Sequence, residues 1–104
     1  MKDILLFISD QHAWRQQGYA GDPVVRTPNL DRLAAEGTVM QNNYTSYPLC
    51  VPARMSMMSG RLASRCGVMS NMAALDSNCP TFAHCLDTAG YETVLCGRMH
   101  FVGG

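Results

Sequence analysis

The sequence contains 104 residues, with eight basic and eight acidic side chains that give a formal net charge of zero. This balance leaves no basic face for nucleic acid and no polybasic patch for a membrane surface. Apolar residues make up 47% of the chain, as in soluble globular domains, and no apolar run approaches the ~18 residues of a membrane helix. The apolar run Ile4 to Ile8 is far too short for a secretory signal, so we expect a cytoplasmic protein.

The first third of the chain predicts a strand, a loop and a helix. Residues 3–9 form a short apolar run, which is typical of a strand buried on both faces. Residues 10–26 are broken by glycine and proline and predict a long irregular loop. A helix follows, with Thr27 as its N-cap, Pro28 at its first position and Gly37 at its end. Its apolar stripe consists of Leu30, Leu33 and Ala34.

The remainder of the chain predicts two more helices and a second strand. One helix runs from Pro52 to about Ser59 and is ended by Gly60. Residues 61–78 are rich in loop signals, and Thr81 to Thr88 predict the next helix. Residues 92–96, Glu-Thr-Val-Leu-Cys, favour a second strand. The five cysteines are odd in number and contain no C-x-x-C pair, so we expect reduced and mostly buried thiols.

The alternation of strands and helices predicts an α/β fold, with a layered and mostly parallel sheet. In such sheets, ligands collect at the carboxyl ends of the strands. Asp10 comes directly after the first predicted strand, and Arg98 and His100 follow the last one. Cys50 lies at the entrance to a helix. The topology therefore predicts that these side chains converge on one edge of the sheet.

The most informative motif is the pentapeptide Cys50 to Arg54, which has the form C-x-P-x-R and is followed by Gly60-Arg61. Because Pro52 suits a helix start and disfavours a helical Val51, the sequence places Cys50 two residues before the helix. Its side chain would then lie beside free backbone N–H groups at the positive end of a helix, where an anion such as sulfate or phosphate binds well.

This motif resembles the signature of the type I, formylglycine-dependent sulfatases of the alkaline phosphatase-like superfamily. Residues 4–11 resemble the first strand and metal-binding turn of that family, and residues 27–37 resemble its first helix. Residues 97–100, Gly-Arg-Met-His, resemble its G-K-x-H turn. The resemblance implies an alkaline phosphatase-like fold. Because sulfatases are several times longer, it also implies that residues 1–104 are the N-terminal portion of a catalytic domain, inactive alone.

The resemblance also assigns roles to the motif residues. It implies that a formylglycine-generating enzyme oxidises Cys50 to formylglycine, whose hydrate is the nucleophile that attacks sulfur. Arg54 would hold this group and neutralise anionic charge with its planar fork. Arg98 replaces the usual lysine and would contact the sulfate. His100 would accept a proton near neutral pH.

A metal site is implied as well. Asp10 and Gln11 would supply oxygen ligands to one divalent cation, together with the formylglycine formed from Cys50. Ca²⁺ fits such hard ligands best, while Mn²⁺ and Mg²⁺ stay open. The Asp-Gln pair is similar to the branch that contains choline sulfatases and phosphonate monoester hydrolases. The other two histidines, His12 and His84, are expected to be structural.

These inferences predict hydrolysis of small organic sulfate monoesters by the complete enzyme. A phosphonate or phosphate ester hydrolase of the same superfamily is an alternative, because the pocket for the leaving group lies mainly outside this sequence. An inactive truncated remnant is the other alternative. The sequence leaves the particular ester and the oligomeric state open.

Overall fold

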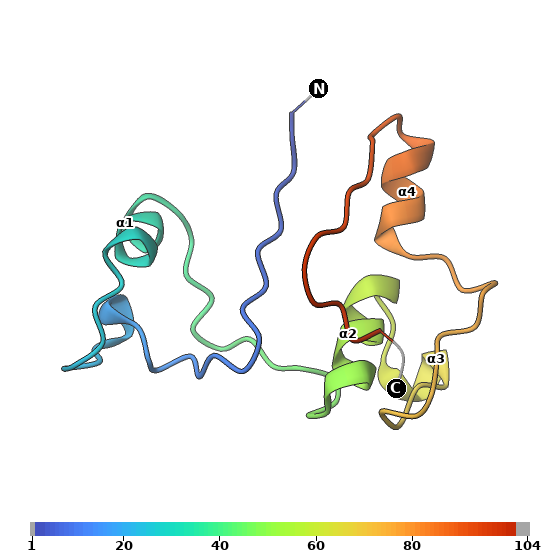
Figure 1. The fold of residues 1–104 in the computed structure, drawn as a ribbon, viewed down its shortest axis with the longest axis horizontal. Helices are drawn as coiled ribbons and strands as arrows, with labels where there is room; N and C mark the ends of the chain where they lie inside the picture. Colours follow the sequence, from blue (N-terminus) through green and yellow to red (C-terminus); the bar gives the residue numbers. More distant parts are fainter. Residues whose placement is uncertain (1, 102–104) are drawn as a thin grey trace. The chain divides into compact units, whose positions relative to one another are not determined.

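The computed structural model describes residues 2–101, and within them it contains helices and loops but no β-strand. A short 3₁₀ helix, η1 (Gly18–Ala20), comes first in the chain. The α-helices among these residues are α1 (Pro28–Glu36), α2 (Cys50–Ser59), α3 (Ala63–Cys66) and α4 (Phe82–Thr88) (Figure 1). The chain divides into two compact units, Met1–Asn42 and Asn43–Gly104.

The two predicted strands, residues 3–9 and 92–96, are not formed in the described part of the chain. Both segments run as open chain, and their side chains are exposed to 85% at Phe7 and 80% at Val94. A strand needs a neighbour that takes up its backbone hydrogen bonds, and neither segment has one within residues 2–101. The predicted parallel sheet is therefore not formed among these residues.

In the first unit, α1 has the predicted ends. Thr27 is the N-cap residue, Pro28 occupies the first helical position, and the N–H of Gly37 donates to the carbonyl of Leu33 at 2.9 Å. The Thr27 hydroxyl, however, does not cap the helix. Its Oγ1 accepts the N–H of Gly18 at 2.8 Å and donates to Oδ1 of Asp31 at 2.9 Å. The predicted N-cap residue thus ties the helix to the preceding loop.

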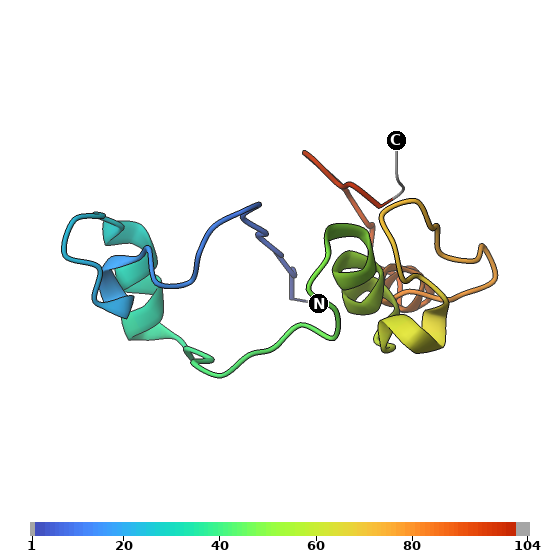
Figure 2. The same cartoon turned by 90° about the horizontal axis from the view of Figure 1, so that it is seen from below.

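Asp31 completes this attachment of η1 to α1, which Figure 2 shows side by side. Its Oδ1 also accepts the N–H of Tyr19 at 2.8 Å. A Cβ atom at Gly18 would lie closer to this carboxylate than van der Waals contact allows, so any other residue there would have to displace the Asp31 side chain. The middle of the loop predicted over residues 10–26 is therefore hydrogen-bonded to the start of α1. The apolar stripe of α1 stays largely open, with Leu33 65% exposed.

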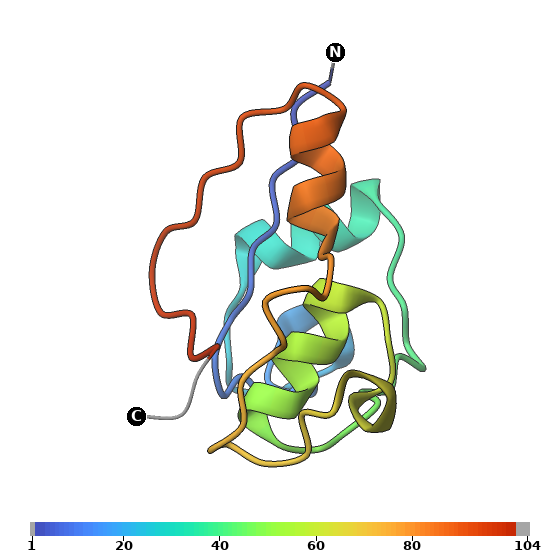
Figure 3. The ribbon, with the colours of Figure 1, turned by 90° about the vertical axis from the view of Figure 1, so that its right-hand side faces the viewer.

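In the second unit, α2 packs against both α3 and α4, as Figures 1 and 3 show. The centre of the core consists of Val51, Met55 and Val68, which are at most 4% exposed. Phe101, the last residue that the structure describes, also packs against this cluster. The helix that carries the C-x-P-x-R motif is thus the best-buried element of its unit.

The start of α2 corrects the sequence-based boundary by two residues. The helix begins at Cys50, so Cys50 is its first residue and does not precede it. Val51 is helical although it comes before Pro52, because it is fully buried in the core. Proline at the third helical position costs no hydrogen bond, since the first-turn N–H groups lack partners within the helix. The predicted end at Gly60 is confirmed, with a left-handed φ of 67°.

The predicted helix near residues 81–88 is confirmed as α4. Thr81 is its N-cap residue, and the Thr81 N–H donates to Nδ1 of His84 at 3.1 Å. The Thr81 hydroxyl lies 2.8 Å from the same nitrogen, so His84 closes a capping box and has the structural role expected of it. The four-residue helix α3 lies within the predicted loop 61–78, where so short a helix leaves no periodic signal.

Candidate active site around Cys50

Cys50 is an exposed free thiol at the first position of α2. All five cysteines are free, but none is buried, so the expectation of buried thiols is wrong. The N-cap residue Leu49 is extended and has no polar side-chain atom with which to accept a first-turn N–H. The thiol therefore lies at a helix N-terminus whose backbone donors must find acceptors elsewhere.

Those donors are fewer than the sequence suggests. The N–H of Val51 donates to Oδ1 of Asn71 at 3.0 Å, and the N–H of Ala53 donates to the carbonyl of Leu49 at 2.9 Å. Pro52 has no N–H at all. Only the N–H of Cys50 is left without an acceptor among residues 2–101. The expected group of free N–H donors is thus reduced to one, and any further binding of an anion here depends on side chains.

Arg54 connects α2 to the Gly-Arg-Met-His turn. Its Nη1 donates to the backbone carbonyl of Met99 at 3.2 Å. Met99 lies between Arg98 and His100, and Figure 1 shows this last segment (red) returning from α4 to α2. One unit therefore holds four predicted catalytic residues, on one helix and on the turn that this helix binds: Cys50, Arg54, Arg98 and His100.

Two of the predicted site residues have unusual backbone conformations. Among the described residues, Gln11 (φ 55°) and His100 (φ 47°) are the non-glycine residues with positive φ. A left-handed conformation costs a residue with a Cβ atom about 1 kcal/mol or more. Such conformations are concentrated at functional sites, where the surrounding structure maintains them. The backbone thus marks one residue of the proposed metal pair and one of the proposed catalytic turn.

Asp10 and Gln11 form a turn in the first unit, and both are exposed. Their carboxylate and amide oxygens are the ligand type that a hard divalent cation prefers. The described residues contain no cluster of three or more His, Cys, Asp or Glu side chains that could hold a metal ion. The pair therefore fits part of a coordination shell of about six oxygens and does not complete it. Convergence of this pair with Cys50 stays a prediction.

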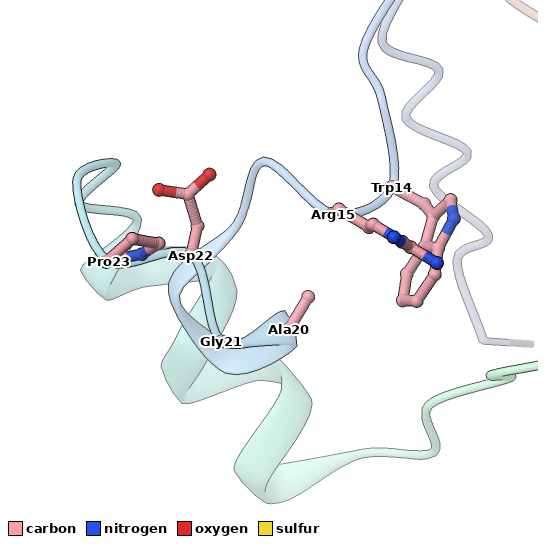
Figure 4. A pocket seen from close by; sticks show the side chains of 6 residues that line it. All are labelled: Trp14, Arg15, Ala20, Gly21, Asp22 and Pro23. Atoms are coloured by element: carbon pink, nitrogen blue, oxygen red, sulfur yellow. The ribbon is translucent and has the colours of Figure 1, made fainter.

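Two surface hollows lie away from the predicted site residues. The larger, of about 450 Å³, belongs to the first unit, and Figure 4 shows the side chains around it. There the Arg15 guanidinium lies over the Trp14 ring at 5.1 Å from its centre. The smaller, of about 270 Å³, lies between the end of α2 and the start of α4. Neither hollow is lined by Cys50 or His100.

The loop beside the larger hollow is held by its own backbone contacts. Oδ1 of Asp22 accepts the N–H groups of Val25 and Val24, each at 2.8 Å. These bonds, first that of Val25 and then that of Val24, lower the pKa of Asp22 below its ordinary value of 3.8. His12 bonds within the same loop, through Nε2 to the carbonyl of Gln16 at 3.0 Å. This contact agrees with the structural role expected of His12.

Asn71 is a residue of the site that the sequence does not reveal. It belongs to no recognisable motif, and 20 residues separate it from the N–H that it accepts. No periodicity or spacing rule predicts such a contact. Only the packing of the loop after α3 against the start of α2 brings the two together.

A cysteine at a helix N-terminus, with an arginine four positions later that is bonded to an Arg-x-His turn, brings a thiol and cationic side chains into one unit, a combination that suits the binding of an anion. The sequence matches the sulfatase family over residues 2–103, and the chain belongs to this family. Membership implies an alkaline phosphatase-like α/β fold. No solved structure matches the chain significantly.

Curated sulfatases from bacteria and mammals are similar in sequence to the chain. It is 53% identical over 79 residues to a choline-sulfatase of Rhizobium meliloti, a match that covers 76% of this chain and 15% of that protein. It is 35% identical over 111 residues to the human N-acetylgalactosamine-6-sulfatase, covering 94% of this chain and 21% of the relative. An ulvan-active sulfatase of Formosa agariphila is 35% identical over 101 residues, covering 97% and 20%. The chain thus spans about a fifth or less of each relative's length.

Proposed function

We propose that this chain forms the N-terminal part of a sulfatase that hydrolyses small organic sulfate monoesters. One observation carries the proposal: the C-x-P-x-R motif begins α2, and its arginine is bonded to the turn that carries Arg98 and His100. The family match over nearly the whole chain supports it. By the full-length enzyme we mean this chain with any further sequence that its gene encodes.

The side chains of the second unit suit this chemistry. A formylglycine at position 50 would supply, as its hydrate, a geminal diol, which no encoded side chain provides, and one of its two hydroxyls would attack sulfur. The guanidinium groups of Arg54 and Arg98 would neutralise the sulfate group in the position of attack. His100 would take up the proton of the attacking hydroxyl, since imidazole accepts protons near neutral pH.

The first unit would contribute to metal binding. Asp10 and Gln11 would hold a divalent cation through their side-chain oxygens, and Ca²⁺ is the best candidate for such a hard ligand set. A cation held there would supply charge stabilisation to the reacting anion. In the full-length enzyme, we also expect residues 3–9 and 92–96 to form strands of the sheet that the family fold contains. Further strands and helices would then cover their apolar side chains.

The direct test is the chemical state of residue 50. In a host that contains a formylglycine-generating enzyme, mass spectrometry of the full-length enzyme should show the Cys50 thiol replaced by an aldehyde. The Cys50→Ala variant should fold and lose hydrolysis of an aryl sulfate such as p-nitrophenyl sulfate. Cys66→Ala, which removes a half-buried thiol outside the motif, is the matched control and should stay active. A wholly unmodified Cys50 in that host would count against the proposal.

The identity of the ester is a second question. The choline-sulfatase match makes choline sulfate the first substrate to assay. A phosphonate or phosphate ester hydrolase is the alternative, because two arginines can bind a tetrahedral phosphorus anion as well as a sulfate group. Paired sulfate, phosphate and phosphonate esters with the same leaving group would separate these activities. An enzyme inactive on all of them, with residue 50 converted, would favour the inactive remnant. The cytoplasmic location stays a prediction. Among residues 2–101, every helix is too short to span a membrane.

A further inference from the structure

The N-terminus of α2 has no capping side chain of its own. Leu49, the residue at the N-cap position, is apolar, whereas Ser, Thr, Asp and Asn are the residues that normally accept the first-turn N–H groups. Asn71, from the loop that follows α3, supplies the missing acceptor through the 3.0 Å bond from the Val51 N–H. A remote residue thus performs the capping function beside Cys50.

The surroundings make this contact specific. Val51 and Val68 are both 0% exposed and belong to one apolar cluster, so the loop that carries Asn71 is packed against the start of α2. Asn71 itself is half-buried. Ahead of Pro52, the helix has only two backbone donors, those of Cys50 and Val51. Asn71 therefore accepts the hydrogen bond of the Val51 N–H, the backbone donor that directly follows Cys50 in the chain.

We propose that Asn71 is a positioning residue, whose side-chain oxygen fixes the first turn of α2 and thereby the direction in which residue 50 presents its reacting group. The consequence for catalysis rests on the proposed function. The structural part does not, because it concerns only the Val51 N–H and its acceptor. The two parts can therefore be tested separately on the same protein.

The experiment compares Asn71→Ala, Asn71→Asp and the control Asn78→Ala in the full-length enzyme. Asn78 lies in the exposed part of a nearby loop, and its recorded bond is made by its backbone N–H, so alanine there leaves that bond in place. Hydrogen–deuterium exchange of the peptide Leu49–Arg54 reports the first turn. Kinetics with p-nitrophenyl sulfate, divided by the fraction of residue 50 converted to formylglycine, report the reaction.

With Asn71→Ala, we expect exchange in this peptide to rise about five-fold, the usual effect of losing an N-cap acceptor. We also expect kcat to fall about ten-fold or more while KM changes less than about two-fold, because misplacement of a reacting group affects the chemical step. Asn71→Asp keeps an oxygen acceptor and should restore both the slow exchange and most of kcat. Asn78→Ala should leave both unchanged.

Three outcomes would overturn the inference. Unchanged exchange in Asn71→Ala would show that the bond does not hold the turn. Restored exchange in Asn71→Asp without recovery of kcat would show that Asn71 acts by another route, such as donation from its amide nitrogen. A loss expressed mainly in KM would likewise refute a positioning role. If the wild type hydrolyses no sulfate ester, the proposed function fails, and the exchange data still decide the structural part.

Discussion

The bond between Arg54 and the carbonyl of Met99 should decide how firmly the catalytic turn is held. A hydrogen bond from a charged donor contributes about 1.5–3 kcal/mol, and the half-buried position of Arg54 places this one near the lower limit. Arg54→Lys keeps the positive charge but replaces a planar fork by a single ammonium group. The ammonium has a single nitrogen, so it lacks the separate Nη atoms with which the arginine fork can reach Met99 and an anion at the same time. Loss of about 1.4 kcal/mol corresponds to a ten-fold rise in opening of the turn.

The assay is hydrogen–deuterium exchange of residues 97–101 in the full-length enzyme, combined with kcat/KM per converted residue 50. We expect about ten-fold faster exchange in Arg54→Lys and a fall in kcat/KM of at least ten-fold. Arg61→Lys is the matched control, because Arg61 is exposed and its recorded bond is made by its backbone N–H. If Arg54→Lys lowers kcat/KM but leaves the exchange of the turn unchanged, Arg54 serves the anion alone and the structural reasoning is refuted.

Three other predictions concern the chain by itself and its first unit. The 104-residue chain should unfold in urea over a broad range and release no sulfate from esters, because few apolar residues are buried in its described part while residues 4–8 are exposed; a sharp two-state transition with measurable hydrolysis would contradict this. Calorimetry of the same chain with Ca²⁺ or Mn²⁺ should detect only weak binding, because Asp10 and Gln11 fill part of the coordination shell, and tight stoichiometric binding would show that the shell is complete. The Asp22 carboxylate, whose pKa is lowered chiefly by the Val25 N–H, stabilises its loop above the ordinary pKa of 3.8 and loses this effect as pH falls through the lower folded-state pKa. Relative to the intrinsic rate at each pH, exchange of residues 22–26 should therefore accelerate at that acidic end in the wild type and much less in Asp22→Asn.

The longer helices α1, α2 and α4 could be predicted from the sequence because their signals are local. Pro28 and Gly37 lie at the ends of α1, and Gly60 ends α2 in the left-handed conformation that glycine favours. Thr81 likewise marks the start of α4. The candidate catalytic residues were also predictable, because they are contained in two short motifs, one around Cys50 and one around His100.

The remaining features depend on contacts between distant residues. The apolar runs at residues 3–9 and 92–96 have the composition of strands, but a strand forms only when a partner takes up its backbone groups. The early start of α2 follows from burial of Val51, which outweighs the extended preference of a residue before proline. The Asn71 cap follows from loop packing. Neither burial nor loop packing can be inferred from spacing within a motif.

At the start of α2, most backbone N–H groups already have an acceptor within the protein. This would affect how the proposed enzyme discriminates between esters. In a phosphate-binding loop, several main-chain N–H groups surround the anion, and mutation cannot remove them. Here Pro52 provides none and Asn71 occupies that of Val51, so in the proposed enzyme recognition of the anion would rely mainly on side chains such as Arg54 and Arg98, which mutation can replace. If the proposed function holds, a few substitutions would be enough to change the choice among sulfate, phosphate and phosphonate esters, while the helix and residue 50 stay in place.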